Sequence, residues 1–87
     1  MSSARLAFSF DGVRPLSMLA RGQRGTIVGV DPHRRDRAER LLALGVTVGA
    51  SATMLQSFPG VVFLCDQTEL AVERGVADMI LVKPVEG

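Results

Sequence analysis

The 87-residue chain contains no tryptophan or tyrosine, and it has only one cysteine and one histidine. Proteins that bind single-stranded nucleic acid generally stack bases on exposed aromatic side chains, and four phenylalanines are the only aromatic residues here. One cysteine excludes an intramolecular disulfide and a zinc cluster of several thiolates. The formal net charge is only +1, so no overall field favours nucleic acid or an anionic membrane. These absences argue against a nucleic-acid binder and a zinc-cluster protein.

Long apolar runs are also missing. The longest run, residues 61–65, is far shorter than the roughly 20 apolar residues that a membrane-spanning helix needs. The first residues contain one arginine and a short apolar stretch at 6–10 before Asp11, which does not fit a signal peptide. We therefore expect a cytoplasmic protein without membrane insertion. The length allows one domain, and we place it at residues 14–87, after an extension at residues 1–13.

The first half of the domain predicts one strand and one helix. A strand is expected at residues 26–30, where Ile27 and Val30 face the core and Gly29 allows a bulge. Asp31 and Pro32 are typical of a helix start, and Gly45 is typical of a left-handed helix end. Apolar residues spaced for one helix face predict the buried stripe, which comprises Ala38, Leu41, Leu42 and Gly45, flanked by Leu44.

The remaining residues favour short strands. Strands are predicted at residues 51–57, 61–65, 69–72 and 79–83, with turns at 58–60 and 66–67. Short helical turns are expected at residues 15–19, with Ser17 as N-cap, and at residues 74–78. Five short strands and one helix predict a mostly β protein, a small closed barrel, because closure removes exposed sheet edges.

The sequence offers little catalytic chemistry. His33 lies in the first turn of the predicted helix among charged residues, and with Asp31 it cannot complete a tetrahedral metal shell. Cys65 falls inside an apolar run, where a buried thiol is unreactive. The segment 22–25 lacks the Lys-Ser/Thr ending of a phosphate loop. We therefore expect no catalytic residue, no cofactor and no metal site.

Two features are candidates for partner binding. Side chains alternate between the two faces of the strand at 61–65. If Phe63 and Cys65 face the core, Val62 and Leu64 face outward and form an apolar patch. The alternatives are the opposite register, or coverage of this face by residues 6–10. The arginines of residues 34–40 are interpreted as a solvated helix face. The alternatives are a surface for an acidic protein partner, which the lack of interleaved aromatics favours, or for nucleic acid.

Three ordered blocks resemble the FeoA family, ferrous iron transport protein A. They read Pro15-Leu16-Ser17-x-Leu19-x-x-Gly22-x-x-Gly25-x-Ile27, then Arg40-Leu41-x-x-Leu44-Gly45-x-x-x-Gly49, then Glu69-Leu70-Ala71-Val72 followed by Ala77-x-x-Ile80-x-Val82. The chain departs from the family pattern at the positions of Val48, Gln67 and Glu73, and its loop at residues 58–60 is short.

The resemblance implies an SH3-like barrel without catalysis that binds FeoB, the membrane-embedded GTPase transporter of ferrous iron, at the inner face of the bacterial inner membrane. The partner-binding residues that we predict are Leu64, Val62, Arg35, Arg40 and Gly45. Self-association is left open. Two alternatives are a generic SH3-like interaction module, such as the repressor-type domain, and a small nucleic-acid-binding barrel. A complete repressor needs an upstream helix-turn-helix for which 87 residues leave no room.

Overall fold

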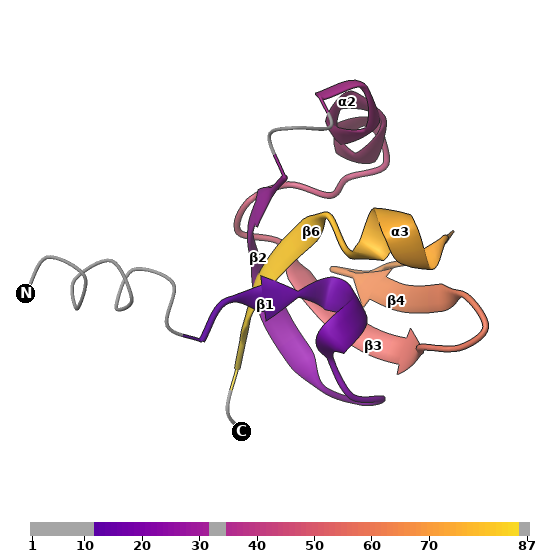
Figure 1. Ribbon diagram of the computed structural model, residues 1–87. Helices are drawn as coiled ribbons and strands as arrows, with labels where there is room; N and C mark the ends of the chain where they lie inside the picture. Colours follow the sequence, from indigo (N-terminus) through magenta and orange to yellow (C-terminus); the bar gives the residue numbers. More distant parts are fainter. Residues whose placement is uncertain (1–11, 32–34, 86–87) are drawn as a thin grey trace, which may run out of the picture.

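The computed structural model describes residues 12–31 and 35–85, and the side chains of residues 35–37 lie outside the described part. Figure 1 shows one strongly curled antiparallel sheet with short helical segments beside it. The strands are β1 (Arg14–Pro15), β2 (Arg24–Val30), β3 (Ser51–Gln56), β4 (Val61–Cys65), β5 (Thr68–Val72) and β6 (Ile80–Pro84). The helices are η1 (Leu16–Met18), a 3-10 turn, α2 (Arg35–Ala43) and α3 (Arg74–Ala77).

The strand order is β1-β6-β2-β3-β4-β5, so within the described residues β1 and β5 are the two ends of an open sheet. The prediction of a mostly β, SH3-like fold is confirmed, but the prediction that the sheet closes into a barrel was wrong. The reason lies in β1, which the sequence did not predict: it has two residues, and η1 begins directly after Pro15. β1 is therefore a two-residue edge strand that pairs with β6 alone and not with β5, and Pro15, which has no N–H to donate, suits such an edge.

The register of the sheet follows the predicted alternation. Pairing of β2 with β6 shifts between Ile27 and Gly29, which is the bulge expected there. In β4, Val61, Phe63 and Cys65 are buried, whereas Val62 and Leu64 are half-buried on the other face. The predicted orientation of Val62 and Leu64 is therefore confirmed.

Helix α2 ends as predicted, because Gly45 follows it with a φ of 96°. Its packing differs from the prediction: Leu41 is buried, but Leu42 is 56% exposed and Leu44 is 49% exposed. Figure 1 gives the reason, since α2 stands beyond one end of the sheet and does not lie across its face. A helix placed there buries a narrow stripe, and the wide stripe that we expected was wrong. The predicted start at Pro32 lies outside the described residues.

Ser17 does not cap a helix. Pro15 holds the N-cap position of η1, and Ser17 lies inside the turn, where its hydroxyl donates a hydrogen bond to the carboxylate of Asp78 after α3. The two residues are 61 positions apart, so the predicted cap was wrong because a tertiary contact replaces the local one. This contact fixes η1 against α3 on the open side of the sheet.

A candidate partner-binding surface at the end of α2

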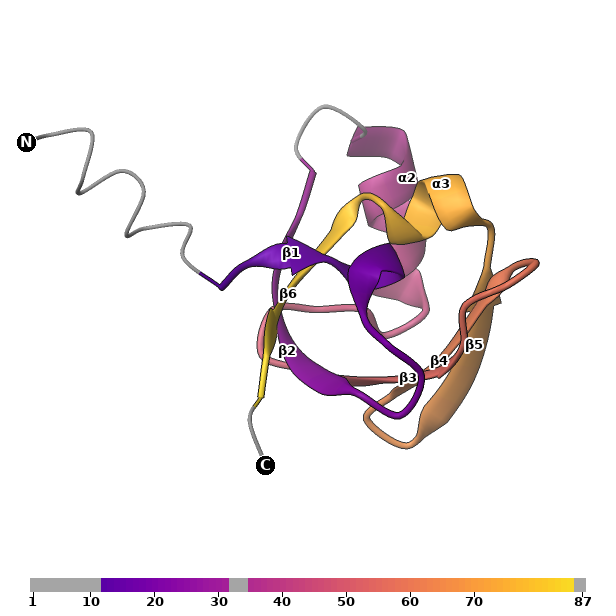
Figure 2. The same cartoon turned by 60° about the horizontal axis from the view of Figure 1, so that its bottom comes forward.

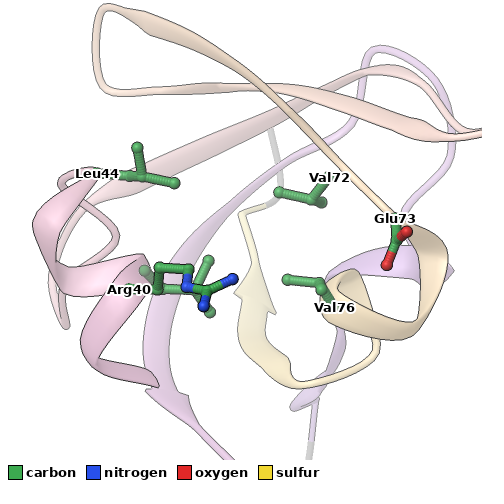
Figure 3. Close-up of a pocket in the computed structure, with 6 residues that line it drawn as sticks. Arg40, Leu44, Val72, Glu73 and Val76 are labelled. Carbon is green, nitrogen blue, oxygen red and sulfur yellow. The ribbon is translucent and has the colours of Figure 1, made fainter. Parts of the chain in front are cut away.

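A hollow of about 230 Å³ lies between α2 on one side and the β5–α3 junction on the other. Apolar side chains form most of its lining, and one cation and one carboxylate join them; the lining comprises Arg40, Leu41, Leu44, Val72, Glu73 and Val76. Figure 3 shows Arg40 extending from α2 into the hollow while Val76 and Glu73 stand on the opposite wall. The arrangement suits an apolar side chain flanked by charge.

The α2 wall is held by the end of the helix. Beyond Gly45, the N–H of Val46 donates back to the carbonyl of Leu41 at 2.9 Å, and Val46 is fully buried. The thiol of Cys65 donates to the carbonyl of Gly45 at 3.5 Å, which joins the helix end to β4. Leu41 therefore stays in the core, and Leu44 is left at the rim of the hollow.

The opposite wall is held by the short helix α3. The N–H groups of Val76 and Ala77 both donate to the carbonyl of Glu73, at 2.9 and 3.0 Å. Ala77 is fully buried, and it anchors the turn on the core. Val72 and Val76 are partly buried and pack against that core, so their free sides face the hollow.

Apolar side chains gather near this helix end. Leu42 and Leu44 are about half exposed, and Val48 in the following loop is 71% exposed. Apolar groups in water are unfavourable, and a local group of them often marks a binding surface. This feature was not predicted, because Leu42 was expected in the buried stripe and Leu44 at its flank.

Four of the five predicted partner-binding residues lie on two separate surfaces. Arg40 lines the hollow and Gly45 ends the helix beside it. Arg35 belongs to α2, but its side chain lies outside the described residues. Because Cys65 points inward to Gly45 and strand side chains alternate, Val62 and Leu64 lie on the outer face of the sheet. Their role in binding stays a prediction.

Sequence reasoning also missed Val72, Glu73 and Val76 as members of the surface. One signal was present: alternation along 69–72 puts Val72 on the same side as Leu70, toward the core. The approach of α2 to that side depends on the whole sheet, and no local pattern encodes it.

The chemistry of the described residues is limited. Burial, and secondarily the neighbouring Asp66 carboxylate, raise the pKa of the Cys65 thiol, so at neutral pH it is a protonated, weak nucleophile. Within residues 12–31 and 35–85, no three His, Cys, Asp or Glu side chains gather where they could hold a metal ion. His33 lies outside the described residues. The described helices include none that is long and apolar enough to span a membrane.

A curled antiparallel sheet with its open side covered by short helical turns defines a small SH3-like domain. The FeoA domain model matches residues 14–84. The chain therefore belongs to the FeoA family, whose members are accessory proteins of iron transport.

Solved structures agree with this assignment. A crystal structure of an iron uptake regulatory protein, FeoA, is 26% identical over 84% of this chain and 97% of that chain, with a TM-score of 0.74. The FeoA protein from Chlorobium tepidum is 29% identical over 84% of this chain and 71% of its own, with a TM-score of 0.73. A manganese-dependent transcriptional repressor shares the fold, with 14% identity over 84% of this chain and 41% of that chain and a TM-score of 0.79. No curated protein matches the chain.

Proposed function

We propose that this chain is a non-catalytic accessory protein of bacterial ferrous iron uptake that binds the cytoplasmic part of a FeoB-type GTPase transporter. The observation that carries the proposal is the hollow at the end of α2, with exposed Leu44 on its rim and Arg40 and Glu73 in its lining. Membership of the FeoA family supplies the iron-transport setting.

The size of the hollow favours a protein partner. Pockets for small molecules usually have volumes of about 300–1,000 Å³. A hollow of about 230 Å³ with apolar walls suits one or two side chains of a partner, in the manner of an anchor residue in an interface. Arg40 and Glu73 would then orient that partner and steer its approach, more than they would add affinity.

Binding is also the means by which such a domain acts on a transporter. The domain changes the transporter's conformational equilibrium only by as much as its affinity differs between the transporter's states. We place the protein in the cytoplasm, recruited by FeoB to the inner face of the inner membrane, without nucleic acid and without a cofactor of its own.

The test is binding of the purified chain to the FeoB cytoplasmic part in its nucleotide-free, GDP and GTP-analogue states. Leu44→Asp adds a charge at the rim of the hollow, and we expect at least about a tenfold loss of affinity, as for an interface anchor. Val28 is 40% exposed on β2 and does not line the hollow, so Val28→Asp is the matched control and should bind as the wild type does.

The outcome also decides between this proposal and the alternative, an SH3-like interaction module unrelated to the transporter. Absence of binding in all three nucleotide states would favour the alternative. An equal loss of affinity in Leu44→Asp and Val28→Asp would show that FeoB binds the chain but does not use the hollow.

A further inference from the structure

Phe58 is the most exposed large apolar side chain in the described part of the chain, at 77%. It lies in the β3–β4 turn, with Ser57 before it and Pro59 after it. Figures 1 and 2 both show this turn projecting from the body of the domain. An aromatic ring at the tip of a projecting turn contributes nothing to the core, and it is unfavourable in water.

Two arginines flank the turn. Arg21 lines the same shallow hollow as Leu55, Ser57 and Phe58. On the other side, the guanidinium of Arg74 in α3 donates a hydrogen bond to the carbonyl of Ser57. Both arginines are exposed, so their remaining donors face solvent.

The position of Arg21 is fixed by the backbone. The N–H of Gly22 donates to the carbonyl of Met54 at 2.7 Å, and the N–H of Met54 donates to the carbonyl of Gln23 at 2.9 Å. These bonds hold the turn that carries Arg21 against β3. Residues 18–24 and 50–63 contain no aspartate or glutamate. The Arg21 side of the turn is therefore locally cationic, although the whole chain has a net charge of only +1; on the α3 side, Glu73 directly precedes Arg74.

The shape of this end of the domain favours a flat surface, rather than an extended peptide, as the partner that the β3–β4 turn contacts. An extended peptide commonly pairs with a free strand edge. Here β3 lies between β2 and β4, and β4 lies between β3 and β5, so neither strand of this turn has a free edge; the free edge nearby belongs to β5. An apolar tip with cations on both sides matches an anionic membrane, whose interface accepts aromatic rings and whose head groups attract arginine.

We propose that the β3–β4 turn contacts an anionic phospholipid surface, with the ring of Phe58 in the interface and Arg21 and Arg74 on lipid phosphates. The contact is weak and peripheral, with no segment crossing the bilayer. Glu73, beside Arg74, lines the hollow at the end of α2, so the lipid-contacting turn and the candidate partner site meet at α3. A protein bound in that hollow would therefore stand next to the bilayer.

The test uses the full chain alone, with no transporter present, so its failure and the failure of the proposed function are distinguishable. Co-sedimentation is measured with vesicles of phosphatidylcholine and with vesicles of equal parts phosphatidylcholine and phosphatidylglycerol. We expect partition into the anionic vesicles only, weakening as salt is raised. Phe58→Ser should lower the partition coefficient about tenfold, and Arg21→Gln about fivefold.

Leu42→Ser is the matched control, because it removes an exposed apolar side chain from α2, away from the turn, and it should leave partition unchanged. Circular dichroism verifies that each variant is folded. Lack of binding to anionic vesicles would overturn the proposal. So would equal binding by Phe58→Ser, Arg21→Gln and wild type, or capture of an acidic peptide such as polyglutamate without capture of anionic vesicles.

Discussion

The thiol of Cys65 donates a hydrogen bond to the carbonyl of Gly45, 20 residues earlier in the sequence, with 3.5 Å between sulfur and oxygen. This contact joins the end of β4 to the residue that ends α2. It places one wall of the candidate partner site directly on the buried strand of the sheet. The geometry of the surface therefore depends on the backbone at Gly45 and on the burial of Cys65.

Gly45→Ala should lower the free energy of unfolding by about 1–2 kcal/mol, because Gly45 has a φ of 96° and an L side chain is strained there. No heavy atom lies within 4 Å of the added methyl, so strain is the whole effect. Gly75→Ala in α3 is the matched control: it also meets open space but lacks the positive φ, and it should be neutral or slightly stabilising. Urea denaturation compares the two, and equal changes would contradict the role of Gly45.

Alkaline pH should destabilise the domain through Cys65. Burial and Asp66 raise the pKa of this thiol above its ordinary value of 9.0, so the unfolded chain releases the proton at lower pH than the folded chain does. Between the two pKa values the folded state binds more protons, and stability falls as pH rises from about 9 upward. Thermal unfolding of the wild type and of Cys65→Ala over this range measures the effect. An equal fall in stability with pH in Cys65→Ala would show that titratable groups other than Cys65 cause the effect.

Leu41→Ala should destabilise the domain by about 2–5 kcal/mol, because Leu41 is the α2 leucine that reaches the core. Leu42→Ala on the same helix removes the same atoms from an exposed position, and it should change stability by less than about 0.5 kcal/mol. Chemical denaturation gives both values. Similar losses in the two variants would mean that α2 packs through a wider stripe than described.

Leu64→Asp should leave the fold intact, because Leu64 is half-buried on the outer face of β4. If that face contacts another chain, the added carboxylate weakens either partner binding or self-association. Size-exclusion chromatography with light scattering, together with a binding assay, separates these effects. Phe63→Asp, one residue earlier and fully buried, should unfold the domain and serves as the contrasting variant. Unfolding by Leu64→Asp as well would show that Leu64 belongs to the core.

Much of the fold could be predicted from local patterns. Alternation placed β4 at its observed bounds and oriented Phe63, Cys65 and Leu64, and Gly45 predicted the end of α2. Features that depend on distant contacts could not be predicted. One such feature is the hydrogen bond from Ser17 to Asp78. Another is the width of the buried stripe on α2, which is narrow because α2 stands beyond the end of the sheet.

The candidate site was predictable only in part, for the same reason. Arg40 and Gly45 follow from the helix and its end. Val72, Glu73 and Val76 join them only because the sheet curls and brings the β5–α3 junction opposite α2. The spacing of residues along the chain does not indicate that α2 and the β5–α3 junction lie opposite each other.

Binding of FeoB at the end of α2 is measured by calorimetric titration of the folded chain into the FeoB cytoplasmic part in each nucleotide state. We expect saturable binding whose affinity differs between nucleotide states, falls at least about tenfold in Leu44→Asp and is retained in Val28→Asp. Absence of binding in every nucleotide state, with all variants folded, would contradict it.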